Sequence, residues 1–251
     1  MKNYKQELIK RYYSTHHKYF TPKTMEEWNM IIDGIELNFG DIFFSISKDS
    51  AILDVACGVG YLEYYLLKKG FTRIYAIDLS EEQINIAKKK LKEYGLNYNH
   101  KIIFEISDAF EYLRKGNKFD VIAMIDFLEH FSKNEIIELL ELSYSALNND
   151  GFFIVRAINA DNPLFGRFFY GDFTHETPFT PDSIRQCCNL VGFKVIRIDY
   201  EKILIKKIKG SLIFLKQFKK AICSLGIKIL SKFLGINPEA FSGNLIVVSK
   251  K

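Results

Sequence analysis

A short apolar run that leads into a glycine-rich turn constrains the fold of this chain more than any other feature. Residues 51–60 read AILDVACGVG, and residues 61–69 read YLEYYLLKK, with helical periodicity. Glycine at positions 58 and 60 permits backbone dihedrals closed to other residues and lets a ligand approach the main chain closely. The run therefore predicts a strand, a ligand-binding turn and a helix in succession.

A second predicted strand, residues 73–78, also ends in an acid, Asp78. In a strand-helix-strand unit, a carboxylate at the end of the second strand can accept hydrogen bonds from ribose hydroxyls. The dinucleotide pattern G-x-G-x-x-G is broken, because Glu63 stands where the third glycine belongs. A bulky acidic side chain fits poorly against a pyrophosphate, so the pattern favours a nucleoside ligand without phosphates.

Residues 48 to 200 resemble, in order, the motifs of the class I S-adenosylmethionine-dependent methyltransferases. Residues 54–60 resemble the first motif, 78–80 the second and 106–110 the acidic motif that contacts the adenine. Residues 119–126 resemble the fourth strand, 129–130 the start of the following helix and 150–156 the fifth strand. The resemblance implies S-adenosyl-L-methionine as cofactor. It places these residues at the cofactor: Asp54, Ala56, Cys57, Gly58, Gly60, Asp78, Leu79, Asp108, Ala109 and Ile125.

The expected fold is α/β: a doubly wound, mostly parallel seven-stranded sheet with helices on both faces. Helices are predicted near residues 58–69, 80–93 and 133–147, and residues 193–201 and 244–249 resemble the closing antiparallel hairpin of the family. We expect a helical leader or lid (1–47), a core (48–201 and 243–251) and a basic amphipathic helical insertion (202–242). Ligands bind outside the carboxyl ends of such strands, where Asp54, Asp78, Asp108 and Asp126 would converge.

The leader carries the aromatic stretch YYSTHHKYF at residues 12–20, and Trp28 follows it. Two interpretations stay open. The leader closes over the cofactor and turns its tyrosines and histidines towards the substrate, or Tyr12, Tyr13, Phe20 and Trp28 are packing residues.

A long loop at residues 156–181 follows the fifth predicted strand, and long loops in compact domains are usually functional. Its D-F-T-H segment at 172–175, before F-T-P at 179–181, resembles methyltransferases of bacterial surface-glycan pathways. Methyl transfer requires an aligned nucleophile and removal of a proton, a task that suits histidine. We expect His175, Asp172 and His130 to be catalytic, with His16 or His17 as further candidates. The alternatives are that His130 caps the helix near Ser132 and that His175 bonds to backbone.

Several function classes are disfavoured. The net charge of +5 is concentrated in lysines after residue 202 without an aromatic-interleaved pattern, so no nucleic-acid partner is expected. Residues 125–130 (IDFLEH) lack the N/D-P-P-Y/F of aminomethyltransferases, and Asp126 alone supplies no metal-ligand set, so no metal is expected. The cysteines at 57, 187, 188 and 223 show no metal spacing, and no signal peptide or spanning segment is evident. A reduced, cytoplasmic setting is expected.

The predicted function is O-methylation of a sugar or related small acceptor in bacterial capsule or surface-polysaccharide biosynthesis. One alternative is a methyltransferase for a lipid or quinone intermediate, because lysines alternate with apolar residues at helical spacing in the insertion. Residues 202–232 would then contact the inner membrane face, although a cap packed on the core is favoured over this and over a dimer surface. A noncatalytic cofactor-binding subunit is the other alternative. The acceptor atom and the oligomeric state are left open.

Overall fold

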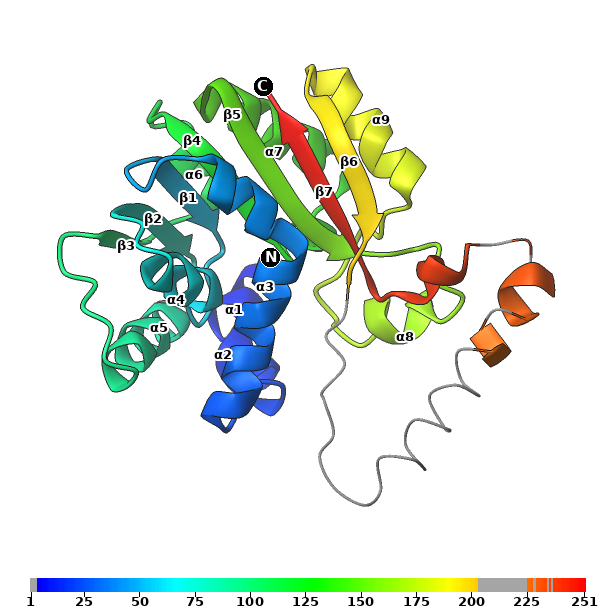
Figure 1. The fold of residues 1–251 in the computed structure, drawn as a ribbon, viewed down its shortest axis with the longest axis horizontal. Helices are drawn as coiled ribbons and strands as arrows, with labels where there is room; N and C mark the ends of the chain where they lie inside the picture. Colours follow the sequence, from blue (N-terminus) through cyan, green and yellow to red (C-terminus); the bar gives the residue numbers. More distant parts are fainter. Residues whose placement is uncertain (1–3, 203–224, 228, 234, 236) are drawn as a thin grey trace.

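The computed structural model describes residues 4–202, 225–227, 229–233, 235 and 237–251. Within them, one sheet has the strand order β3-β2-β1-β4-β5-β7-β6 (Figure 1). The pairs among β1 to β5 are parallel, and β7 is antiparallel to both β5 and β6. The expected mostly parallel sheet with a closing hairpin is confirmed. Its strands are β1 (Ala51–Val55), β2 (Arg73–Asp78), β3 (Ile102–Ile106), β4 (Phe119–Ile125), β5 (Leu147–Ile158), β6 (Lys194–Tyr200) and β7 (Asn244–Lys250).

Helices alternate with the strands and also make up most of residues 4–45. Local capping explains several of their ends. Ser80 accepts a hydrogen bond from the Gln83 amide at the start of α5, and Thr180 caps α9 just before a proline. The helices are α1 (Tyr4–Lys10), α2 (Tyr12–Thr15), η1 (His17–Tyr19), α3 (Met25–Ser45), α4 (Tyr61–Lys68), α5 (Glu81–Glu93), α6 (Ala109–Leu113), η2 (Leu128–His130), α7 (Lys133–Ala146), α8 (Phe165–Phe169), α9 (Pro181–Val191) and η3 (Pro238–Phe241).

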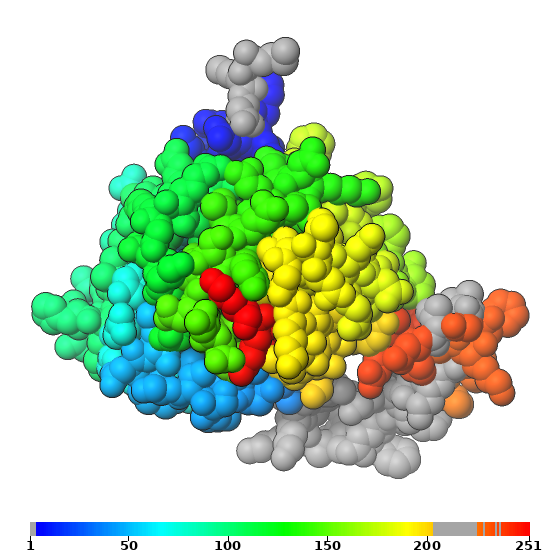
Figure 2. Space-filling view, turned by 90° about the horizontal axis from the view of Figure 1, so that it is seen from above, coloured from blue at the N-terminus to red at the C-terminus, as the bar shows by residue number. Residues whose placement is uncertain are grey.

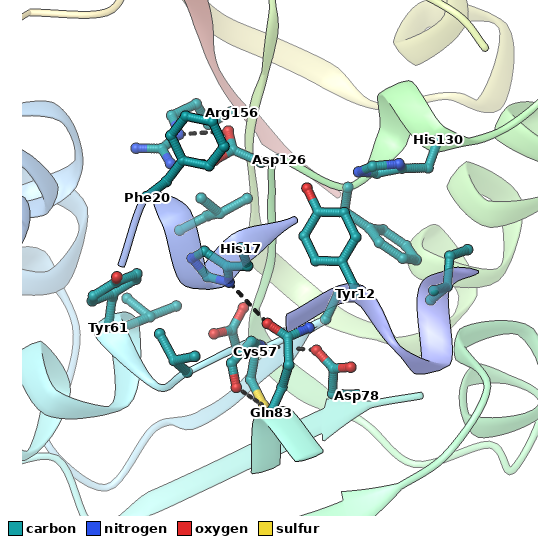
Figure 3. Close-up of a pocket in the computed structure, with 18 of the residues that line it drawn as sticks. Tyr12, His17, Phe20, Cys57, Tyr61, Asp78, Gln83, Asp126, His130 and Arg156 are labelled. Carbon is teal, nitrogen blue, oxygen red and sulfur yellow. Dashed lines mark hydrogen bonds and ion pairs between the residues drawn. The ribbon is translucent and has the colours of Figure 1, made fainter. Parts of the chain in front are cut away.

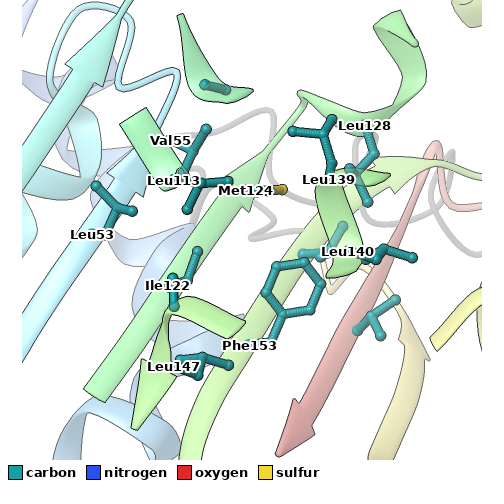
Figure 4. Close-up of a cluster of buried hydrophobic side chains, with 14 of the residues drawn as sticks. Leu53, Val55, Leu113, Ile122, Met124, Leu128, Leu139, Leu140, Leu147 and Phe153 are labelled. Carbon is teal, nitrogen blue, oxygen red and sulfur yellow. The ribbon is translucent and has the colours of Figure 1, made fainter. Parts of the chain in front are cut away.

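Two apolar clusters cover the two faces of the sheet. Helices α6, α7 and α9 pack on one face against strand residues such as Leu53, Ile122 and Phe153 (Figure 4). Helices α3, α4 and α5 pack on the other face against strand neighbours such as Ile52 and Val121. Successive strand residues point to opposite faces, so fully buried strands such as β1 need apolar residues at nearly every position. This close-packed framework fixes the residues at the strand ends.

The predicted insertion at 202–242 lies largely outside the described residues, so its packing and its membrane contact stay predictions, as do the region boundaries. Cys223 lies there too. Among the described helices, none is long and apolar enough to cross a membrane.

Candidate active site

A cavity of about 1190 Å³ lies between the carboxyl ends of β1 to β4 and the helical leader. All four strand-end acids that the sequence analysis singled out line it: Asp54, Asp78, Asp108 and Asp126. They meet because parallel strands end at the same edge of a sheet. Ligand pockets usually measure about 300–1,000 Å³, so this cavity has room for a nucleoside and a second small molecule.

Nine of the ten residues expected at the cofactor line this cavity: Asp54, Ala56, Cys57, Gly58, Asp78, Leu79, Asp108, Ala109 and Ile125. Gly60 is not among the lining residues. It begins α4 with a φ of +89°, and a Cβ atom there would lie 2.9 Å from the Cβ of Ala87 in α5. Glycine at this position therefore lets the turn pack against α5.

Asp78 holds the glycine turn in place. Its Oδ2 accepts a hydrogen bond from the Gly58 amide at 2.9 Å, and its Oδ1 accepts one from the Ser80 amide at 2.8 Å (Figure 3 shows the side chain). Burial raises the pKa of Asp78 to about 6. Each oxygen of a carboxylate can accept more than one hydrogen bond, so Asp78 retains capacity for a ligand's hydroxyls.

Two further acids lie buried beside the turn. Asp54 is 3% exposed and Glu63 is fully buried. Burial raises the pKa of both groups, that of Glu63 to about 7. The two carboxyl groups hydrogen-bond each other, and no other donor among the described residues reaches Asp54 Oδ1 or either carboxylate oxygen of Glu63. A protonated carboxyl group can donate, so the raised pKa values allow one proton to be shared between these two buried acids.

The leader forms the opposite wall of the cavity (Figure 3). The ring Nδ1 of His17 lies 2.9 Å from the Gln83 side-chain oxygen, and Ser80 Oγ donates to the Lys10 carbonyl at 3.0 Å. Trp28 instead is fully buried, with its ring 4.5 Å from that of Tyr61. The two interpretations of the leader therefore apply to different residues, since some line the cavity and others pack.

Asp126 follows β4 in a left-handed conformation, with a φ of +52°. Arg156 holds it with two hydrogen bonds, one of them from Nε to Oδ1 at 2.7 Å. Arg156 also donates to Glu201 at 3.1 Å. The charge of Asp126 is thus paired within the protein.

The expected catalytic residues separate into two layers. His130 lines the cavity, whereas His175 and Asp172 lie behind it. His130 Nδ1 is 2.9 Å from Thr174 Oγ1, and burial and His175 lower the pKa of His130 to about 4. His175 Nδ1 is 2.8 Å from the carbonyl oxygen of Phe169, which is the backbone bond that we considered as its alternative role. Ser132, not His130, caps α7.

Thr174 belongs to this second layer, and Tyr12 reaches it from the cavity wall; the sequence analysis gave neither residue this role. Tyr12 donates to Asp172 Oδ2 at 2.7 Å, and the Thr174 hydroxyl donates to Asp172 Oδ1 at the same distance. The only sequence signal was the position of Thr174 inside the D-F-T-H segment. One potential ligand atom from each of His130, Asp172 and His175 lies within 4.8 Å of the others. Because Asp172 already accepts bonds from Tyr12 and Thr174, the expectation of no metal stays our prediction.

Comparison with known proteins identifies chains of similar sequence and fold. Residues 52–151 match the family described as a methyltransferase domain. The putative methyltransferase YqeM of Bacillus subtilis is 31% identical over 112 residues, which are 44% of this chain and 43% of that protein. The chain spans less than half the length of the first curated relatives that it matches.

Two solved structures match almost the whole chain. A SAM-dependent methyltransferase from Archaeoglobus fulgidus has a TM-score of 0.64 at 19% identity, covering 96% of this chain and 99% of that one. Magnesium protoporphyrin IX methyltransferase of Synechocystis PCC 6803, with bound SAH, has a TM-score of 0.65 at 13% identity, covering 98% and 99%. At these identities the structures establish the shared fold. Residues 52–151 therefore match a methyltransferase domain, and the chain shares the fold of these S-adenosylmethionine-dependent methyltransferases.

Proposed function

We propose that this chain transfers a methyl group from S-adenosylmethionine to a hydroxyl oxygen of a sugar or related small acceptor. The observation that carries the proposal is a single cavity in which four strand-end acids face a wall containing His130. When bound, S-adenosylmethionine supplies an electrophilic methyl group on a positively charged sulfonium. The acids would then bind the cofactor, and the histidine would act on the acceptor.

The cofactor fits the acidic side of the cavity. Asp54 is a buried acid that lines the cavity, which suits the positive charge of the methionine portion. Asp78 has lone pairs left for ribose hydroxyls after accepting from Gly58 and Ser80. Gly58 has a φ of +55°, a conformation that favours glycine. Because glycine has no side chain, the ligand can approach the backbone of the turn closely.

His130 suits the removal of the acceptor's proton. Because its pKa lies near 4, the imidazole is neutral at pH 7 and one ring nitrogen carries a lone pair. In the proposed reaction, Nε2 of His130 takes the proton that the acceptor hydroxyl loses. A positioned general base of this kind contributes about 10²–10⁴-fold to a rate.

The sugar acceptor is supported by the D-F-T-H segment that resembles methyltransferases of surface-glycan pathways. Its Thr174 holds the ring of His130 and its Asp172 binds Tyr12 of the leader, so the segment supports the cavity wall nearest to the proposed base. We therefore place the acceptor among the building blocks of a bacterial capsule or surface polysaccharide.

Calorimetry with S-adenosylmethionine, S-adenosylhomocysteine and NAD tests the cofactor. We expect micromolar binding of the first two and none of NAD. Asp78→Asn should abolish binding. Asp120→Asn is the matched control, because Asp120 accepts a bond from the Ala51 amide at the opposite end of β1. Equal affinity of the Asp78→Asn variant and the parent protein would refute the ribose assignment.

Transfer of a tritiated methyl group to nucleotide sugars and simple glycosides tests the acceptor. His130→Gln should lower turnover by about 10²–10⁴-fold with unchanged cofactor affinity. His100→Asn is the control, because His100 lies on an exposed turn with a φ of +63° that asparagine tolerates. Unchanged turnover in His130→Gln would remove His130 from the mechanism.

An acceptor with an apolar tail is a second candidate, favoured by aromatic side chains beside α8. Tyr170 is 79% exposed and Phe173 is 92% exposed, in the same loop that carries Asp172. Flotation with anionic vesicles tests this. Binding that is lost in Tyr170→Ser/Phe173→Ser would favour a lipid-linked or quinone acceptor, and a protein that stays with the soluble fraction would exclude it.

A further inference from the structure

Four hydrogen bonds connect His130, at the cavity wall, to the leader. Thr174 Oγ1 lies 2.9 Å from His130 Nδ1 and 2.7 Å from Asp172 Oδ1, and the Thr174 amide donates to the same carboxylate oxygen at 2.8 Å. Tyr12 donates to Asp172 Oδ2 at 2.7 Å. Asp172 and Thr174 are 7% and 6% exposed, so water competes little for these bonds. The linked groups come from α2, from η2 and from the loop between α8 and α9.

The direction of each bond follows from which groups can donate. An ionised carboxylate only accepts hydrogen bonds, so the hydroxyl protons of Thr174 and Tyr12 both point to Asp172. Thr174 then has only lone pairs to offer to His130, and Nδ1 of His130 must carry the ring proton. The neutral ring is thereby fixed in one tautomer, with the lone pair on Nε2.

The charge states agree with these directions. Burial together with the neighbouring Asp172 raises the pKa of Tyr12, so its hydroxyl keeps its proton. Burial opposes ionisation of Asp172, but the hydrogen bonds from Thr174 and Tyr12 lower its pKa below the ordinary value. A second histidine cannot replace His130 here. His175 must donate its own Nδ1 proton to the Phe169 carbonyl, and it does not line the cavity.

We propose that Thr174, Asp172 and Tyr12 are positioning residues that hold His130 in the tautomer with a bare Nε2, and that Tyr12 makes this arrangement depend on the leader. The inference rests on the proposed function insofar as it takes His130 to be the base. The same leader also contacts the cofactor side through His17 and Gln83, 2.9 Å apart, and Gln83 borders the glycine turn. The leader therefore contributes to both the cofactor side and the His130 side of the cavity.

The tautomer itself is the primary readout, because it needs neither cofactor nor acceptor. Nitrogen-15 NMR of the histidine rings in the purified chain should show His130 protonated at Nδ1 and bare at Nε2 in the parent protein. Thr174→Val removes the acceptor and should give a mixture of tautomers, whereas Thr174→Ser should restore the parent pattern. Asp172→Ala removes both carboxylate acceptors, which frees the Thr174 hydroxyl to donate to Nδ1 and should move the ring proton to Nε2.

Turnover should follow the tautomer. We expect Thr174→Val to lower kcat by about 10-fold to 100-fold, and Asp172→Ala by up to about 10⁴-fold, as a misplaced ring proton does in serine proteases. Tyr12→Phe should also lower kcat and increase hydrogen exchange of the leader amides. Tyr13→Phe, which changes the neighbouring tyrosine outside this set of bonds, is its control.

The outcomes separate the two proposals. Unchanged ring nitrogens in both Thr174→Val and Asp172→Ala would overturn the positioning role, whatever the activity. Shifted tautomers in a protein that transfers no methyl group would uphold the positioning role and overturn the proposed function. Cofactor affinity should stay unchanged in Thr174→Val, because Thr174 does not line the cavity.

Discussion

Replacing Gly60 by alanine tests the close packing of the glycine turn. Gly60 has a φ of +89°, and a left-handed conformation costs a residue with a side chain about 1–2 kcal/mol. The new Cβ would also lie 2.9 Å from the Cβ and 3.4 Å from the Cα of Ala87, which is fully buried. Overpacking of this kind costs about 1–3 kcal/mol. We therefore expect Gly60→Ala to reduce the free energy of unfolding by about 2–5 kcal/mol in total.

Gly70 supplies a matched control. Its φ of +85° is nearly the same, but no heavy atom of the described residues lies within 4 Å of the Cβ that alanine would add. Gly70→Ala should cost only the conformational part, about 1–2 kcal/mol. The gain from restricting the unfolded chain is shared by both variants and cancels in the comparison. Their difference, about 1–3 kcal/mol, isolates the contact with Ala87.

Urea unfolding followed by circular dichroism measures both variants, with midpoints and slopes fitted separately. A double-mutant cycle with Ala87→Gly then removes the opposing methyl group. If the contact is the cause, the cycle should show a favourable coupling of about 0.5–3 kcal/mol. Equal midpoints for Gly60→Ala and Gly70→Ala, or a coupling near zero, would refute the packing argument.

Three other expectations follow from the buried residues. Glu63 has a raised pKa, from 4.5 to about 7, so its contribution to stability is present below pH 4.5 and is lost as the pH rises through 7. Glu63→Gln should gain up to about 3 kcal/mol over the parent between pH 4.5 and 8 in urea titrations, and a pH-independent difference would contradict this. Trp28, the single tryptophan, lies against Tyr61 of the cavity wall, so cofactor binding should change its fluorescence and Trp28→Phe should abolish the signal. Thr180→Ala removes the cap of α9 and should cost about 1 kcal/mol in thermal unfolding, with an unchanged midpoint counting against the cap.

The strands and helices of the core could be predicted because their patterns are local. Residues 73–78 were expected as a strand and form β2, and a helix expected at 133–147 forms α7 (Lys133–Ala146). The position of the cavity could be predicted from the same patterns, because the acids at the ends of β1 to β4 lie at one edge of the sheet. Nine cofactor candidates lie at that edge for this reason.

The second layer of the site could not be predicted in this way. The bond from Tyr12 to Asp172 joins residues 160 positions apart, and no periodicity in one sequence specifies such a pair. The D-F-T-H segment drew attention to this loop, and a backbone bond of His175 was one of its alternatives, but the partners, His130 for Thr174 and the Phe169 carbonyl for His175, depend on how the chain folds. The burial of Glu63 was also missed, because an acidic residue in a helical pattern is usually exposed.

The place of β7 in the sheet has a consequence for the order in which the chain folds during synthesis. β7 lies between β5 and β6 and is the neighbour through which β6 joins the described sheet. Figure 2 shows its red atoms between the green and yellow surfaces of the segments before it. While residues 244–250 are still inside the ribosome, β5 has an unpaired edge and β6 has no partner. Unpaired strand edges promote aggregation. Codons that slow the ribosome shortly before β7 would therefore prolong the time when the nascent chain is most prone to aggregate.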